Sequence, residues 1–272
     1  MSEVQPGSPD QQSFDRQIIE SKNACIGVNP DGAYVSSWKV KNPQGQLVDV
    51  LYQGKTLRRT GVPLLFPNFG PATGMRQHGF GRDTEWQLTT EGNKAVMTLS
   101  SESDKIDDAA RKEFPYPFLA TVTVEAEDDG SMVYELRVLN TGNQNLKLSP
   151  GLHPYWRVNH SDKSEIKIDG IEGFDATQID WDNNPPDTFY DYNGPVTVIL
   201  PDKRITIEDI TDGKPQVKKI VTWSQELEKD DHDLLCVEPF CGKENAINED
   251  PIIVNPNDEF RMRIRFKTNF AS

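Results

Sequence analysis

The chain has 272 residues, of which 43 are acidic and 29 are basic, and its formal net charge is −14. Because so acidic a chain gains nothing from the counterion release that drives nucleic-acid binding, the charge argues against a nucleic-acid partner. No apolar run has the length of a membrane span and the N-terminus has no apolar signal-peptide region. We therefore expect a cytoplasmic protein without a membrane partner.

Residues 1–17 are predicted to form a mobile N-terminal tail, because the first dozen are polar and include Pro6 and Pro9. From Ile18 onward, short apolar runs alternate with turn signals that contain glycine or proline. The first three runs are Ala24–Val28, Tyr34–Val40 and Val48–Tyr52. The chain contains no linker and no repeat of fixed period, so residues 18–272 are predicted to be a single domain, and we expect a monomer.

Alternation of apolar and polar residues is clearest in the middle and at the end of the chain. It runs through residues 120–126, 132–138 and 260–266, and in the last of these the polar positions are arginines. This period of two marks half-buried strands, and we expect the arginines to face solvent or to form cross-strand ion pairs. Helical periodicity is scarce, with a short helix predicted at 104–112. Many short strands with regular turns predict an all-β sandwich or barrel.

The stretch Gly61–Trp86 is rich in glycine and proline, a composition that is typical of a loop. Functional side chains often lie on loops that a rigid scaffold positions. Within this stretch His78 stands between Arg76 and Arg82, beside glycines and aromatic residues. This pattern indicates a ligand pocket that contains His78.

His153 and Glu238 are two further candidates for the same site. His153 follows a strand-like run and precedes Tyr155, and an aromatic wall of this kind suits a sugar ring. Glu238 interrupts an apolar strand, where burial would raise its pKa toward the range of a general base. Each also has a structural interpretation, as a hydrogen-bonded core histidine and as a strand-end glutamate facing water. His160 and His232 lie in polar surroundings, and we expect both to be exposed and without a role.

Two histidines and one carboxylate fit two kinds of chemistry. They can bind a metal as a His2Glu set, or they can supply an acid and a base to a metal-free reaction. The HExxH spacing of zinc proteases is absent, and Cys236 and Cys241 lack the partner pair of a zinc site. With Cys25, they are expected to be reduced thiols. A nucleophile elbow, a P-loop and a dinucleotide fingerprint are also absent, which argues against hydrolases, kinases and dehydrogenases.

Four sequence blocks together carry a family resemblance. They are RTGVPLLFPNFG at 59–70, QHGFGR at 77–82 with Trp86 following, His-Pro-Tyr at 153–155 and Val-Glu-Pro at 237–239. In this order the blocks resemble the aldose 1-epimerase (mutarotase) superfamily, and within it they are most similar to the hexose-6-phosphate mutarotases, also called glucose-6-phosphate 1-epimerases. The resemblance extends from about residue 20 to the C-terminus, with departures from the family pattern at Thr60, Gly81 and Trp156.

The resemblance implies a large antiparallel β-supersandwich of the galactose mutarotase type and a cofactor-free interconversion of the α and β anomers of an aldohexose. It makes Glu238 the base that takes the proton of the anomeric hydroxyl and His153 the acid that protonates the ring oxygen. His78 would bind or polarise that oxygen. We therefore expect no metal and no other cofactor, and a small-molecule sugar or sugar phosphate as partner. The substrate-binding residues that it implies are Arg59, Arg82, Asp175 and Gln77.

Charge predicts a phosphorylated substrate. Arg58, Arg59, Arg76 and Arg82 are four cations within 25 residues of a strongly acidic chain. Because a guanidinium fork suits phosphate, the predicted substrate is a 6-phosphorylated aldohexose such as glucose 6-phosphate, although at least two of the arginines are expected to pair with surface carboxylates. Three alternatives stay open: an epimerase of free sugars, a non-catalytic carbohydrate-binding protein on the same fold, and a His2Glu metalloenzyme.

Overall fold

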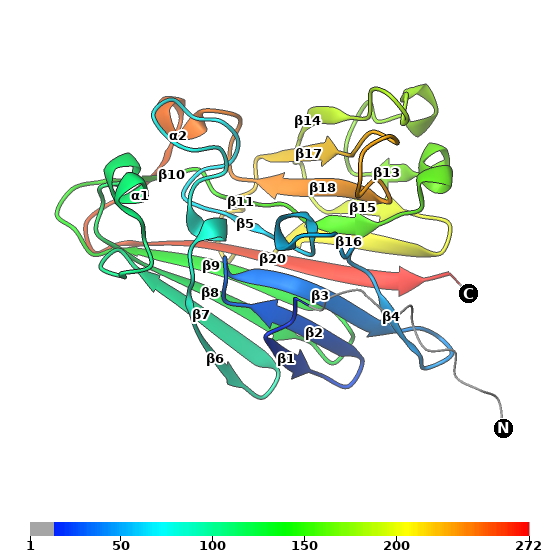
Figure 1. Ribbon diagram of the computed structural model, residues 1–272, viewed down its shortest axis with the longest axis horizontal. Helices are drawn as coiled ribbons and strands as arrows, with labels where there is room; N and C mark the ends of the chain where they lie inside the picture. The colour runs from blue at the N-terminus through cyan, green and yellow to red at the C-terminus, as the bar shows by residue number, and fades with distance from the viewer. Residues whose placement is uncertain (1–13, 272) are drawn as a thin grey trace.

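The computed structural model describes residues 14–271, and its regular secondary structure consists almost entirely of antiparallel strands (Figure 1). The largest sheet has eight strands in the order β13-β15-β16-β20-β9-β8-β7-β6. Along this path the strands are Lys167–Asp169 (β13), Val196–Ile199 (β15), Lys203–Asp209 (β16), Glu259–Phe270 (β20), Met132–Asn140 (β9), Phe118–Ala126 (β8), Lys94–Ser100 (β7) and Gln87–Glu91 (β6). The predicted all-β class is confirmed.

A six-stranded sheet carries the candidate site. Its path is β14-β17-β18-β11-β5, and β12 also pairs with β18. All seven residues of β18 are buried, which explains why this segment is apolar on both faces of the strand. The strands of this sheet are Asp187–Asp191 (β14), Lys219–Trp223 (β17), Leu234–Phe240 (β18), Gly151–Leu152 (β11), Leu64–Leu65 (β5) and Tyr155–Arg157 (β12).

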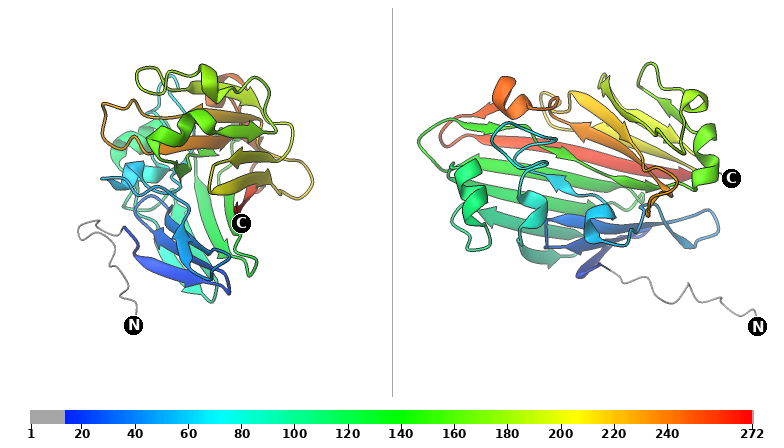
Figure 2. Two further views of the ribbon diagram at one scale, coloured as in Figure 1. Left: turned by 90° about the vertical axis from the view of Figure 1, so that its right-hand side faces the viewer. Right: turned by 45° about the horizontal axis from the view of Figure 1, so that its top comes forward.

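Two smaller sheets complete the structure. The first has the order β1-β2-β3-β4, and its strands β1 and β2 contact β8. In Figure 2 it forms a layer over the long strands of the largest sheet. The second consists of β10 and β19. The strands are Gln17–Glu20 (β1), Ala24–Asn29 (β2), Tyr34–Lys41 (β3), Leu47–Asp49 (β4), Leu146–Leu148 (β10) and Ile252–Val254 (β19).

The helices are short and lie in connections. Asp107 caps the first one by accepting a hydrogen bond from the N–H of Ala110, so this helix begins later than the predicted start at residue 104. Within residues 14–271, none of the helices combines the length and the apolar character that crossing a bilayer requires. The helices are α1 (Asp108–Glu113), α2 (Ala246–Glu249) and the 3-10 turns Leu57–Arg59, Gly81–Asp83, His160–Glu165 and Ala176–Gln178.

Residues before the predicted boundary at residue 17 already contact the sheet. The hydroxyl of Ser36 donates to Asp15 at 2.6 Å, and the N–H of Arg16 donates to the carbonyl of Val28 at 2.9 Å. These contacts attach residues 15 and 16 to β2 and β3, so the predicted tail extends too far. Its first 13 residues lie outside the described part of the chain, and the single domain stays a prediction.

The last strand shows how the sequence pattern produces the core. In β20 every second residue from Phe260 to Phe266 is buried, as the alternation predicts. The arginines on the opposite face form the expected cross-strand ion pairs. Arg261 lies 2.7 Å from Glu135 of β9, and Arg265 lies 3.1 Å from Glu127 just beyond β8.

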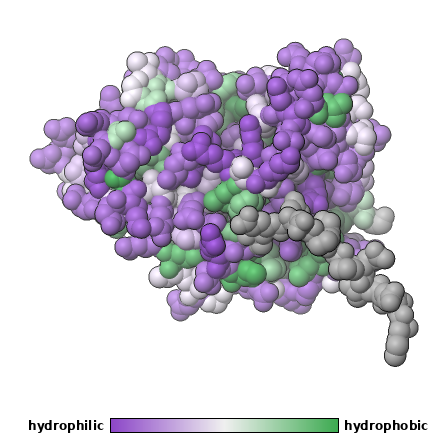
Figure 3. Space-filling view, viewed as in Figure 1, coloured by the Kyte–Doolittle hydropathy of each residue, from purple (hydrophilic) through white to green (hydrophobic). Residues whose placement is uncertain are grey.

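Hydrophilic residues cover most of the face shown in Figure 3. The large apolar side chains that are exposed on the described residues belong to five separate segments of the chain. They are Ile18, Leu47, Leu119, Leu227 and Ile253. Scattered apolar residues of this kind are normal on a monomer, and the monomeric state stays a prediction.

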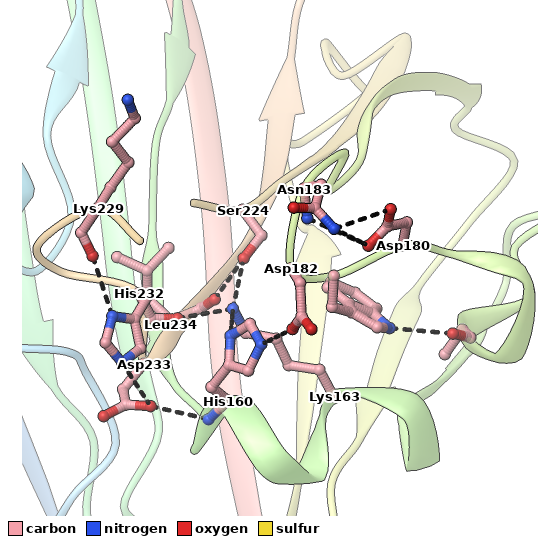
Figure 4. Close-up of polar contacts among 12 residues, drawn as sticks. His160, Lys163, Asp180, Asp182, Asn183, Ser224, Lys229, His232, Asp233 and Leu234 are labelled. Atoms are coloured by element: carbon pink, nitrogen blue, oxygen red, sulfur yellow. Dashed lines mark hydrogen bonds and ion pairs between the residues drawn. The ribbon is translucent and has the colours of Figure 1, made fainter. Parts of the chain in front are cut away.

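A buried lysine organises a polar cluster beside the six-stranded sheet (Figure 4). Lys163 has an exposed fraction of 0%, and its Nζ donates to the hydroxyl of Ser224 at 2.8 Å and to the carbonyl of His232 at 2.6 Å. His160, which we predicted to be exposed, has 14% of its side chain exposed and lies 2.7 Å from Asp182. That prediction was wrong because long-range contacts cover a locally polar segment.

Lys163 should make the stability of the protein rise with pH. Burial lowers its pKa to about 8 in the folded state, against about 10.4 in an unfolded chain. Between these values the unfolded state binds more protons, so raising the pH favours folding. Relative to Lys163→Met, the wild-type free energy of unfolding should increase by roughly 2–2.5 kcal/mol between about pH 7.5 and about pH 10. Urea denaturation of both proteins measures this, and a difference that does not change with pH contradicts it.

Candidate active site

Six of the seven predicted site residues line one cavity of about 320 Å³. Its walls also include aromatic side chains from β12, β14 and β17. A cavity of this size with a few convergent polar groups is typical of a small-molecule site. The six residues are His78, His153, Glu238, Arg59, Gln77 and Arg82.

Strand pairing brings His153 against Glu238. Strand β17 pairs with one edge of β18, and β11 and β12 pair with the other edge. His153 lies between β11 and β12, so both of its flanks are attached to β18, and its N–H donates to the carbonyl of Pro63 at 3.0 Å. Its ring stacks on that of Tyr155 with centroids 4.6 Å apart. As a result, Nε2 of His153 lies 3.5 Å from Oε1 of Glu238.

Burial shifts both groups of this pair toward their neutral forms. Glu238 is 2% exposed and His153 is 7% exposed, which excludes a glutamate that faces water. Desolvation raises the pKa of Glu238 well above its ordinary value of 4.5, and the nearby charge of Asp187 adds to the shift. Desolvation likewise lowers the pKa of His153 well below 6.5. Burial therefore favours the state in which the proton of this pair lies on Glu238 and His153 is neutral.

His78 is fixed as a hydrogen-bond donor toward the cavity. Its Nδ1 accepts a hydrogen bond from the N–H of Gly70 at 3.1 Å, so in the neutral ring the hydrogen lies on Nε2. Burial and the positive charges of Arg82 and Arg59 lower its pKa to about 3, and the ring is neutral at physiological pH. The residue adopts a positive φ of 66°, a backbone conformation that is uncommon for residues other than glycine.

The four arginines divide into two kinds. Arg58 and Arg76 pair with carboxylates, at 2.6 Å from Asp83 and 2.9 Å from Asp107, which confirms that at least two do so. Arg59 and Arg82 form no ion pair within residues 14–271. The guanidinium of Arg59 lies 4.8 Å above the Trp223 ring. The Nε of Arg82 is buried and has no hydrogen-bond partner in the same part of the chain. These two cations thus keep their charge available to a ligand.

Asp175, the seventh predicted residue, lies outside the cavity lining. Its exposed carboxylate accepts hydrogen bonds from the N–H and the hydroxyl of Thr177, where it caps a 3-10 turn. Asp187, which the sequence reasoning missed, lines the cavity instead. It is the first residue of β14 and pairs with Trp223 of β17. Strand β17 in turn pairs with β18, which carries Glu238. Its local sequence is an ordinary polar loop, so the strand pairing was the signal needed to find it.

The metal-like grouping differs from the His2Glu set considered from the sequence. Ligand atoms of His153, Cys236 and Glu238 all lie within 4.8 Å of one another. His78 is not part of this group, and its Nδ1 is already occupied by the N–H of Gly70. A cluster that combines imidazole, thiol and carboxylate is chemically suited to zinc.

A close pair of titratable groups beside a polar cavity with aromatic walls, on an antiparallel β-scaffold, is compatible with an enzyme that transfers protons on a sugar ring. In a comparison with known families, residues 17–267 match the aldose 1-epimerase family. The chain belongs to this family and is an isomerase that acts on sugars. The resemblance noted in the sequence is confirmed.

Individual relatives agree with this assignment. A Cenchrus ciliaris protein, provisionally named as a glucose-6-phosphate 1-epimerase, is 23% identical over 90% of this chain and 81% of its own length. A Synechocystis sp. PCC 6803 structure has a TM-score of 0.74 at 22% identity, covering 97% of this chain and 100% of that one. The structure of the galactose mutarotase related enzyme of Lactobacillus acidophilus has a TM-score of 0.72 at 16% identity, covering 94% of this chain and 97% of that one. The structural likeness shows a shared galactose mutarotase-like fold.

Proposed function

We propose that the protein interconverts the α and β anomers of a hexose 6-phosphate, with glucose 6-phosphate as the type substrate. The observation that carries the proposal is the pair Arg59 and Arg82, which face the cavity without an ion-pair partner within residues 14–271. In a chain of net charge −14, two available guanidinium groups beside an acid–base pair favour an anionic substrate. The provisional name of the Cenchrus ciliaris relative points the same way.

Glu238 and His153 supply the proton transfers. The 3.5 Å separation allows their shared proton to pass to His153, which leaves Glu238 as a carboxylate. Glu238 then takes the proton of the anomeric hydroxyl, the bond between C1 and the ring oxygen breaks, and His153 gives its proton to that oxygen. The open-chain aldehyde rotates about the C1–C2 bond, and the same steps in reverse close the ring on its other face. One proton enters and one leaves the pair in each direction.

The remaining cavity residues bind and orient the sugar. His78 donates from Nε2 to the ring oxygen, and its lowered pKa keeps it a neutral donor that does not compete with His153 as the acid. Asp187 accepts hydrogen bonds from ring hydroxyls, in place of Asp175, which the resemblance implied as a substrate-binding residue. Trp223 and Tyr155 provide apolar surface for the sugar face. Gln77 and the two free arginines bind the phosphate.

Anomer exchange measured by NMR tests the function directly. With α-glucose 6-phosphate, the purified protein should accelerate the approach to anomeric equilibrium well above the spontaneous rate. With glucose, kcat/KM should be lower by roughly tenfold or more, because one charge-assisted hydrogen bond contributes about 1.5–3 kcal/mol. Equal values of kcat/KM for the two sugars would instead assign an epimerase of free sugars. Binding of either sugar without any acceleration would assign a carbohydrate-binding protein.

A further inference from the structure

A buried thiol lies directly beside the predicted acid–base pair. Cys236 stands two residues before Glu238 on β18, so both side chains leave the same face of the strand. Cys236 also pairs with Tyr155 of β12, two residues after His153. The exposed fraction of Cys236 is 0%, and it does not line the cavity. The thiol therefore lies beside His153 and Glu238 but is shielded from the cavity.

The three side chains have the composition and the spacing of a metal site. All three ligand atoms lie within 4.8 Å of one another. Zinc bonds of about 2.0–2.3 Å to nitrogen, oxygen and sulfur place tetrahedral ligand atoms about 3.3–3.7 Å apart. The observed distance of 3.5 Å between Nε2 of His153 and Oε1 of Glu238 is already in this range. Binding would require the thiol to approach by about 1 Å at most.

We propose that His153, Cys236 and Glu238 form a binding site for zinc, and that zinc bound there inhibits the enzyme. The metal enters through the cavity, which His153 and Glu238 line. As it binds, the Cys236 thiol and the carboxyl group of Glu238 release their protons to water, and the thiolate becomes the third ligand. Its fourth position faces the cavity and is open to water, as in zinc sites with three protein ligands. Zinc uses the lone pairs of both the acid and the base, so neither group can exchange a proton with the sugar.

Metal binding can be tested without any assumption about catalysis. Titration of the metal-free protein with zinc chloride in a calorimeter should give one site per chain. Titration with cobalt should give a thiolate-to-metal charge-transfer absorption. Cys236→Ala should abolish this absorption and weaken zinc binding by at least about 100-fold, since loss of an outer-shell partner alone costs 10–100-fold.

Cys241→Ala is the matched control for Cys236→Ala. It removes an equally buried thiol, just after β18, that contacts Met262 and does not line the cavity. This variant should bind zinc and cobalt like the wild type. Glu238→Gln, which keeps the thiol, provides a second test if Cys236→Ala does not fold, and it should also weaken zinc binding. Zinc binding that survives Cys236→Ala, or a wild-type cobalt complex without the thiolate absorption, overturns the site.

The inhibition rests on the proposed function, and a separate assay decides it. Zinc should stop the exchange of glucose 6-phosphate anomers at concentrations that match the Kd measured by calorimetry. A chelator should restore the exchange. Each variant is compared with its own zinc-free rate. Inhibition should be lost in Cys236→Ala and kept in Cys241→Ala. Exchange that zinc accelerates would overturn the inhibition. A protein that binds zinc as described but exchanges no anomers would instead count against the proposed function.

Discussion

Glu238→Gln should lower kcat for anomer exchange by about 100-fold to 10,000-fold, the range that general acid–base catalysis contributes. The amide has the shape of the carboxylic acid but cannot take the proton of the anomeric hydroxyl. Because Glu238 is buried and its pKa is raised, the wild-type side chain is already destabilised as an anion, so an uncharged replacement should keep the fold. The effect should appear in kcat rather than KM. NMR exchange rates and thermal denaturation of the same samples measure both properties.

His153→Asn and Glu208→Gln complete this experiment. The first removes the acid of the pair and should reduce kcat to a similar extent. The second makes the same Glu-to-Gln change at a half-buried carboxylate of β16, which lies in the eight-stranded sheet. It should leave kcat for anomer exchange within about twofold of the wild-type value. A folded Glu238→Gln or His153→Asn protein with near-normal exchange would refute the roles that we assign.

The all-β class could be predicted because its strands carry local signals. The alternation in β8, β9 and β20 reports burial on one face and needs no tertiary information. Boundaries are harder to predict. Residues 15 and 16 have a polar local sequence, yet contacts with β2 and β3 order them. The exposure of His160 was predicted wrongly for the same reason, since its partner Asp182 is distant in sequence.

The candidate site was predictable to the extent that its residues are unusual where they stand. Glu238 is conspicuous because it is a carboxylate in an apolar strand, and His78 because it lies in a glycine-rich loop. Asp187 is one of 43 acidic residues, and nothing in its local sequence distinguishes it from the others. Only the pairing of β14 with β17 and of β17 with β18 brings it near Glu238. Asp175 was implied by the family resemblance, but its carboxylate caps a turn.

Arg82→Ala should reduce kcat/KM for glucose 6-phosphate by roughly 10-fold to 150-fold while changing that for glucose by about threefold at most. The first range follows from the 1.5–3 kcal/mol of a charge-assisted hydrogen bond. Arg82 is the sharper choice of the two free arginines because its buried Nε has no partner within residues 14–271, so a ligand phosphate satisfies a donor that is otherwise unpaired. Arg59→Ala should act in the same direction. This variant also loses the contact of the guanidinium with the Trp223 ring, so we expect kcat/KM for glucose to fall as well.

Arg204→Ala separates a specific phosphate contact from the general field of the protein. Arg204 is exposed on β16 and does not line the cavity, so its removal makes the net charge more negative by the same amount without touching the site. Exposed charges are screened by salt, and this control should change kcat/KM for glucose 6-phosphate by about twofold at most. The ratio of kcat/KM for glucose 6-phosphate to that for glucose is then measured for all three variants by NMR exchange. If Arg82→Ala lowers kcat/KM for both sugars alike, or if Arg204→Ala has the same effect as Arg82→Ala, the phosphate is not bound where we propose. The substrate is then a free sugar.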